Sequence, residues 1–361
     1  MPALVDDAAW LAAMLEAEAA LARANAREGV IPAEAARAVE AAARPEAFDL
    51  AELGRAGGEA ASPVVPLARL LRERAGEDAH RGATSQDVLD TAMMLVARRA
   101  LAVITQDAAA AADAAAALAR EHRDTPISGR TLLQRAVPTS FGLKAAGWLI
   151  AIEEALAILV AVRESGLAVQ LGGPVGHGSP TIAADVADEL GLVHPVLPWH
   201  TNRVRVAGLA AALGVLAGAL AKVARDVTLL AQAEVAEARE GGDAGGPDRG
   251  SSSAMPHKRN PVAAVSVLAC AHRTPGLVAT VLAGMPQEHE RAAGAWQAEW
   301  GTVTELLSLT GSAAAWSREL LEGLEVDPER MRAGVGDGEP DLGCAGELVD
   351  RALLAHRAAT R

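Results

Sequence analysis

Tyrosine is absent from this sequence, and phenylalanine and cysteine occur only twice each in 361 residues. The two cysteines, Cys270 and Cys344, are too few for a disulfide framework or a cysteine-rich zinc site. This cysteine usage fits a reducing cytoplasm. Because there is no tyrosine, no phenol can donate a proton in a reaction that the chain catalyses.

The sequence also lacks the usual signals for passage into or across a membrane. Its first residues carry acidic side chains early and show no basic stretch followed by an unbroken apolar run, so no signal peptide is expected. The most apolar stretch, residues 206–221, is mostly alanine and glycine, is short for a span and has basic residues near both ends. We expect a buried helix there and a cytoplasmic protein with no membrane partner.

Positive charge is scarce as well, since the formal net charge is −13 and the isoelectric point is near 5.2. Nucleic acids and anionic membranes require basic surface, so neither is expected as a partner. A small-molecule substrate is favoured, and it can still be an anion where a few cations line a cleft. With 51% hydrophobic residues, the chain has enough apolar surface to fold.

Alanine, leucine, glutamate and arginine dominate the sequence, and no clear alternation of valine, isoleucine and threonine is visible. We therefore predict an all-α fold. Capping residues predict helix starts at Thr139-Ser140 and Asp327-Pro328, and Gly166 and Gly241 predict helix ends. The predicted helices cover residues 7–27, 33–44, 64–75, 86–120, 139–165, 180–190, 204–238, 261–283, 294–323 and 344–358.

The longest predicted helices carry small or apolar residues on nearly every face, which a single amphipathic stripe does not require. We expect a tight bundle of long helices that other subunits complete, as in a homotetramer. The alternative is that alanine reflects only helix propensity and genome composition. We divide the chain into an N-terminal helical domain (1–84), a central bundle (85–324) and a shortened C-terminal helical segment (325–361).

One glycine-rich segment, Gly250–Pro261, carries reactive side chains and reads GSSSAMPHKRNP. Three hydroxyls on a turn, followed by a cation and an amide before a helix, can clamp a carboxylate while a serine oxygen reaches a carbon. Lysine occurs only at positions 144, 222 and 258, so Lys258 stands out among the arginines. A phosphate-binding loop is excluded, because its glycine and lysine spacing is missing and no strand precedes the segment.

This segment resembles the signature loop of the fumarase/aspartase superfamily. The resemblance implies that Ser252, six residues before the lysine, is the catalytic residue. It also implies that Lys258 and Asn260 bind a substrate carboxylate, and that Ser251 and Ser253 are neighbours without a catalytic role.

Two further blocks resemble the superfamily in the expected order. In His80–Ala92 the resemblance assigns His80, Thr84 and Ser85 to substrate carboxylates, although Thr84 and Ser85 also form an ordinary helix N-cap. In Arg130–Trp148 it assigns Gln134 to substrate binding.

Other stretches, including LPWHTNRVR at 197–205, resemble the 3-carboxy-cis,cis-muconate cycloisomerase branch. The resemblance implies conversion of this tricarboxylate to 4-carboxymuconolactone, a step in protocatechuate breakdown by the beta-ketoadipate pathway. It makes His200 and Arg203 candidate substrate-binding residues. The alternative for His200 is a surface histidine that caps a helix.

Leu132 supports this branch. Many lyases of the superfamily have a histidine there, which assists the departure of an amine or an alkoxide, although some ammonia lyases lack it. Viewed in reverse, lactone formation expels a carboxylate. The conjugate acid of this leaving group has a pKa of about 4, so its departure needs no proton donor at position 132. Arg135 stands where cycloisomerases often have histidine, and an arginine is suited to bind one of three carboxylates.

No cofactor or metal is expected. The nine histidines form no metal-binding pattern, and the Gly172–Gly178 run lacks the context of a nicotinamide fingerprint. Two alternatives stay open. One is a lyase that releases fumarate, such as adenylosuccinate or argininosuccinate lyase, and the other is a catalytically silent relative.

Overall fold

The computed structural model describes residues 1–241, 250–255 and 257–359. As far as they are described, the residues form two compact units, each built from three separate stretches. The first unit comprises 1–102, 160–211 and 276–308, and the second comprises 103–159, 212–275 and 309–361. The three domains predicted from the sequence divide the chain differently and stay a prediction.

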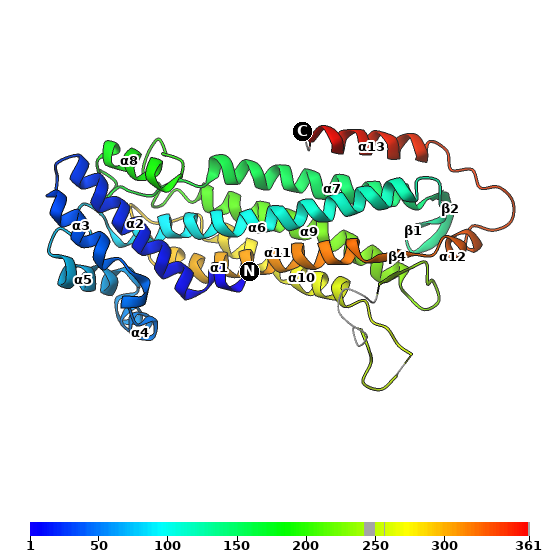
Figure 1. Ribbon diagram of the computed structural model, residues 1–361, viewed down its shortest axis with the longest axis horizontal. Helices are drawn as coiled ribbons and strands as arrows, with labels where there is room; N and C mark the ends of the chain where they lie inside the picture. Colours follow the sequence, from blue (N-terminus) through cyan, green and yellow to red (C-terminus); the bar gives the residue numbers. More distant parts are fainter. Residues whose placement is uncertain (242–249, 256, 360–361) are drawn as a thin grey trace. The chain divides into compact units, whose positions relative to one another are not determined.

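Long helices dominate the described chain, as predicted (Figure 1). They are α6 (Ser85–Glu121), α7 (Phe141–Ala161), α9 (Val204–Leu230), α10 (Val262–Ala283) and α11 (Ala295–Glu322). In α6, five consecutive residues from Met93 to Ala97 are fully buried. A helix shows this pattern only where it is covered on all sides, which agrees with the expected burial on several faces.

Further helices complete the first unit. They are α1 (Pro2–Val5), α2 (Asp7–Arg27), α3 (Ala33–Ala42), η1 (Pro45–Ala47), α4 (Leu50–Ala60), α5 (Val64–Ala75), η2 (Val162–Gly166) and α8 (Pro180–Leu190). Helix α2 packs against α3 and α8, and α5 packs against α3 and α4 (Figure 1).

The described residues of the second unit form two small antiparallel sheets. One is the hairpin of β1 (Pro126–Thr131) and β2 (Gln134–Ser140), and the other pairs β3 (Ala238–Glu240) with β4 (Leu324–Val326). Helices α12 (Pro328–Ala333) and α13 (Ala345–Ala359) follow β4 (Figure 1).

Two features of the second unit differ from the predicted helices. The hairpin was not expected from the sequence. Both faces of β1 and β2 become exposed toward the turn, so the two strands do not show the alternation of apolar and polar residues by which a strand is recognised. The helix predicted for residues 204–238 was too long, since α9 ends at Leu230. There the chain turns back through Ala236, at φ +51°, so that β3 can pair with β4. This pairing overrides the helix propensity of residues 231–237.

The predicted helix starts are confirmed by their caps. The Ser140 hydroxyl accepts the Leu143 N–H before α7, and the Asp327 carboxylate accepts the Arg330 N–H at the start of α12. At Gly166 the helical turns after α7 end, also as predicted.

Within the described residues, three helical stretches are long and apolar enough, by length and composition, to cross a membrane: Phe141–Gly166, Val204–Leu230 and Val262–Ala283. The second contains residues 206–221, for which a buried helix was predicted. In the structure its Val206, Leu209, Leu213 and Leu216 are buried within the protein.

Candidate active site

The residues predicted to form the site fall into two groups, one in each unit. The first unit contains His80, Thr84, Ser85, His200 and Arg203, and the second contains Gln134, Ser252, Lys258 and Asn260.

The signature loop closes on itself at its base. The backbone N–H and the side-chain amide of Asn260 both donate to the Gly250 carbonyl oxygen, at 2.8 and 3.1 Å, and Ser251 pairs with Arg259. Gly250 has φ +70°, and a Cβ there would lie 2.5 Å from the Asn260 carbonyl oxygen. Only glycine fits this closure.

Within the loop, Ser252 differs from its neighbouring serines. Its Oγ accepts hydrogen bonds from the Ala254 and Met255 N–H groups, at 3.3 and 3.2 Å, and its side chain is half-buried. Ser251 and Ser253 are exposed. Two amide donors on one hydroxyl oxygen stabilise negative charge there, which is what a serine needs in order to transfer its proton.

The chain on both sides of the loop is fixed to the second unit. The Glu240 carboxylate accepts the N–H groups of Ala263 and Ala264, at 3.0 and 2.9 Å, in the first turn of α10. An acidic side chain is favourable at a helix N-terminus, where free N–H groups and the helix dipole are positive. Lys258, whose N–H donates to the Met255 carbonyl at 3.0 Å, lies in the exposed part of the loop.

Gln134 lies beside the turn of the β1–β2 hairpin, where it pairs with Thr131. The turn residues Leu132 and Leu133 both have positive φ, +50° and +66°, as in a type I′ turn, and their exposed fractions are 96% and 75%. Gln134 and Arg135 are exposed as well.

The stem of this hairpin is held by an ion pair. Arg130 donates to both carboxylate oxygens of the buried Glu237, at 2.9 and 2.8 Å. The turn therefore extends from a fixed base, and it offers an amide and a guanidinium but no acid near Leu132.

His80 is positioned by an acidic residue that the sequence did not single out. Its Nδ1 lies 2.6 Å from Oε1 of Glu18, a buried residue of α2. Burial of the ring disfavours its charged form, but the charge and hydrogen bond of Glu18 outweigh burial, so the pKa of His80 is raised. Glu18 is hard to recognise in the sequence, because it stands among other acidic residues in an alanine-rich helix.

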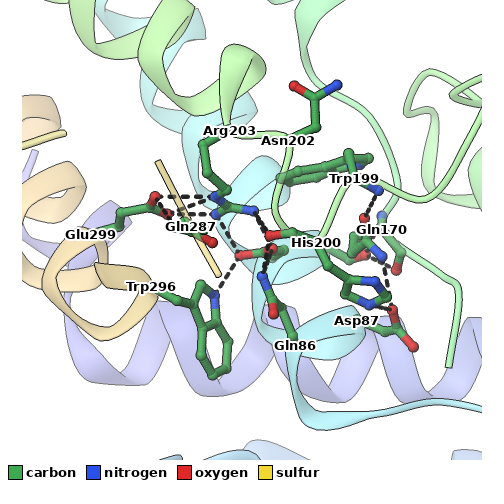
Figure 2. Close-up of polar contacts among 12 residues, drawn as sticks. Gln86, Asp87, Gln170, Trp199, His200, Asn202, Arg203, Gln287, Trp296 and Glu299 are labelled. Atoms are coloured by element: carbon green, nitrogen blue, oxygen red, sulfur yellow. Dashed lines mark hydrogen bonds and ion pairs between the residues drawn. The ribbon is translucent and has the colours of Figure 1, made fainter. Parts of the chain in front are cut away.

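Asp87 organises the start of α6. Its carboxylate accepts the Thr84 N–H at 2.9 Å, so it fixes the turn that presents Thr84 and Ser85. It also accepts from Nε2 of His200 at 2.8 Å and from the side chain of Gln170 at 3.0 Å (Figure 2). The N–H groups of Gly172 and Gly173 complete its partners, at 3.0 and 2.8 Å.

His200 is therefore not a surface residue that caps a helix, because only 5% of it is exposed and it lies against Asp87. Its carbonyl oxygen accepts from Gln86 at 2.8 Å. The contacts of His200 support a role in holding the start of α6.

Arg203 does not fit the predicted substrate-binding role. Its side chain is fully buried, and its N–H groups donate to Asp90, Glu299 and the His200 carbonyl (Figure 2). Both carboxylates are buried too, and their charges and hydrogen bonds outweigh desolvation, so the pKa of Arg203 is raised. Because all of its N–H donors are occupied, Arg203 stabilises the fold and has no free N–H group for a ligand.

Metal ligands do not gather in the described residues, where no three histidine, cysteine, aspartate or glutamate side chains are placed to hold an ion. The expectation that the protein needs no metal and no cofactor stays a prediction.

Comparisons with known proteins identify the family of the chain. A family model described as "Lyase" matches residues 4–276. The 3-carboxy-cis,cis-muconate cycloisomerase of Pseudomonas aeruginosa is 46% identical over 93% of this chain and 75% of that protein. The nitrosuccinate lyase of Streptomyces davaonensis is 48% identical over 98% of this chain and 77% of that protein.

A solved structure is similar over the whole chain. The 3-carboxy-cis,cis-muconate lactonizing enzyme of Pseudomonas putida superposes with a TM-score of 0.90 and 33% identity, covering 100% of this chain and 98% of that one. Together with the matched family model, this similarity shows that the chain belongs to the lyase family, as its resemblance to the fumarase/aspartase superfamily predicted.

Proposed function

We propose that this protein is a 3-carboxy-cis,cis-muconate cycloisomerase, which converts its substrate to 4-carboxymuconolactone. The observation that carries the proposal is that a sequence relative and a solved structure of this activity each match nearly the entire chain. The proposed partner is thus a small tricarboxylate.

In the proposed reaction, one substrate carboxylate oxygen attacks a carbon of the conjugated double bonds and closes the lactone. The electron pair moves to the carbon next to another carboxylate, and Ser252 delivers its proton to that carbon. The two amides on Ser252 Oγ support this transfer, because they stabilise the alkoxide that remains.

The remaining site residues would hold the three carboxylates. They are His80, Thr84, Ser85, Gln134, Lys258 and Asn260, which different copies of the chain in the proposed tetramer would bring together. Lys258 and the neutral donors would also stabilise the negative charge that develops on the carboxylate beside the protonated carbon.

A second candidate is elimination of nitrite from nitrosuccinate, and the 48% identity to a nitrosuccinate lyase favours it. In that reaction a base removes a proton from carbon, and the C–N bond breaks to release nitrite and fumarate. Nitrite, like a carboxylate, is a weakly basic leaving group. The lack of an acid at Leu132 therefore fits both reactions and disfavours lyases that expel an amine or an alkoxide.

A product assay distinguishes these functions. The purified protein is incubated separately with 3-carboxy-cis,cis-muconate, nitrosuccinate, adenylosuccinate and argininosuccinate. Lactone from the first compound supports the proposal, and nitrite from the second supports the second candidate. Fumarate from either of the last two identifies another lyase of the superfamily, and no product from any compound identifies a catalytically silent relative.

We also propose that the protein is a cytoplasmic homotetramer. In the single chain, apolar side chains on three of the long helices are about half exposed, among them Ile158 of α7, Val215 of α9 and Val265 of α10. Other copies of the chain would cover these faces. Light scattering should give a particle near four times 36.9 kDa, and a stable, active monomer would contradict this assembly.

A further inference from the structure

Helix α2 holds the segment that contains His80 at two points. The Glu18 carboxylate lies 2.6 Å from Nδ1 of His80, and the side-chain amide of Asn25 donates to the Arg81 carbonyl oxygen at 2.9 Å. Glu18 and Asn25 are seven positions apart, so they lie on one face of α2, about two turns from each other. His80 has φ +62°, a left-handed conformation that needs such support in a residue other than glycine.

The contact between Glu18 and His80 is enclosed by protein. The Glu18 side chain is completely buried, and 10% of the His80 side chain is exposed. The second carboxylate oxygen of Glu18, Oε2, is buried and has no hydrogen-bond partner in the described part of the chain. A buried carboxylate that is paired with a single group depends on that group to compensate its charge. The pair is therefore most favourable when the His80 ring is positively charged.

Two further charged side chains act on the ring, Arg72 of α5 and Asp87 of α6. Burial has the largest effect on the pKa of His80 and lowers it, and Arg72 lowers it as well. The charge and hydrogen bond of Glu18 act in the opposite direction, with a smaller contribution from Asp87, and the net result is a raised pKa. The ring thus stays charged at a pH where a free histidine has lost its proton.

The charge of the ring decides what its other nitrogen can do. With Nδ1–H donating to Glu18, a neutral ring has no hydrogen on Nε2, which is then an acceptor and repels an anion. A charged ring carries hydrogen on both nitrogens. Among the described residues, Nε2 of His80 has no hydrogen-bond partner, so its hydrogen is available to a ligand. Only the charged form of His80 can therefore bind a carboxylate from this position.

We propose that Glu18 is a positioning residue for substrate binding, which keeps both nitrogens of His80 protonated so that Nε2–H can donate to a substrate carboxylate. The inference rests on the proposed function, which requires a carboxylate at His80. It adds that the affinity for this carboxylate depends on the protonation of the Glu18–His80 pair.

The test measures binding without turnover, by isothermal titration calorimetry with propane-1,2,3-tricarboxylate. Wild type and Glu18→Gln are compared at several pH values from about 5 to 7. Glutamine keeps a hydrogen-bond acceptor but not the charge, so His80 should lose its proton at a lower pH in the variant. The ratio of wild-type to variant affinity should therefore increase with pH, to about tenfold, which is the loss expected for one charged hydrogen bond. Glu16→Gln, at an acidic residue of α2 that pairs with Arg99, is the matched control, and its ratio should not change with pH.

A second measurement distinguishes this role from a merely structural one and does not depend on the folding of Glu18→Gln. The wild type should take up protons when it binds the tricarboxylate between about pH 7 and 9, because the ligand favours the charged ring. Calorimetry in buffers of different ionisation enthalpy measures this uptake. His80→Gln should take up fewer protons, and adding Glu18→Gln to His80→Gln should not weaken binding further.

An affinity ratio that does not change with pH would overturn the inference. Equal proton uptake by wild type and His80→Gln would also overturn it, as would a wild type that binds no tricarboxylate. If the wild type forms no lactone while binding still depends on Glu18 and on pH in this way, the proposed function fails and this inference stands.

Discussion

Asn260 donates both its backbone N–H and its side-chain amide to the carbonyl oxygen of Gly250, at 2.8 and 3.1 Å. The ten-residue step between these two residues contains Ser252 and Lys258, so one double contact closes the loop that carries both. Asn260 thus has a structural role in addition to the carboxylate-binding role that the resemblance implies.

Gly250→Ala should damage catalysis more than stability. A Cβ at position 250 would collide with the Asn260 carbonyl, and the positive φ would be strained as well. We expect kcat to fall by about tenfold or more, because a misplaced catalytic group slows the reaction steeply. Gly58→Ala is the control, since a Cβ there meets nothing within 4 Å in α4 and should leave kcat unchanged. Steady-state kinetics and thermal melts compare the two, and a fully active Gly250→Ala would contradict the role of the closure.

Ser252→Ala and Lys258→Met should fail differently. Loss of Ser252 removes the proton donor, so kcat should fall by about 10²-fold while KM changes little. Loss of Lys258 removes a charge that binds substrate in both the ground state and the transition state, so KM should rise and kcat should fall together. Ser253→Ala is the matched control, because Ser253 is exposed and lacks the two amide contacts. If Ser253→Ala were inactive and Ser252→Ala active, the proton donor would have to be reassigned.

Arg203→Met should unfold the protein more easily, without a specific effect on substrate binding. It leaves Asp90 and Glu299 buried without their cation, and such a loss destabilises a protein by about 3–5 kcal/mol. Chemical denaturation should show this decrease, and Arg55→Met, at an exposed pair, should change stability by less than about 1 kcal/mol. A stable Arg203→Met variant with a raised KM would instead restore Arg203 as a binding residue.

The pair of His80 and Glu18 should make stability depend on pH. The pKa of His80 is raised in the folded protein, so the folded state holds the proton more tightly than the unfolded state. The stabilisation is complete below the ordinary pKa of 6.5 and is lost as the pH rises through the raised value. The unfolding free energy of wild type should therefore exceed that of Glu18→Gln by more at acidic than at alkaline pH. A difference that stays constant with pH would show that the pair does not titrate in this way.

The sequence predicted the elements of the fold where local signals decide them. Helices 7–27, 64–75 and 180–190 were predicted with the boundaries that the structure shows, because caps and apolar periodicity mark them. The β1–β2 hairpin and the early end of α9 depend on pairing between distant segments, which propensity does not reveal.

The site shows a similar division. The motifs singled out the loop of Ser252 and the turn of Thr84 because their residue types and spacing are distinctive, and the roles of these residues stay a prediction. Arg203 was misjudged, since Asp90 and Glu299, which occupy it, lie far from it in the sequence. Asp87 was not singled out because its contacts with His200 and Gly172 exist only in the folded chain.

The most direct test of the proposed reaction is the product that the protein forms from 3-carboxy-cis,cis-muconate in deuterated water, followed by nuclear magnetic resonance. The account predicts 4-carboxymuconolactone with one deuterium on the carbon that Ser252 protonates, formed at least about 10²-fold more slowly by Ser252→Ala. Absence of lactone, or lactone formed by Ser252→Ala at the wild-type rate, would contradict it.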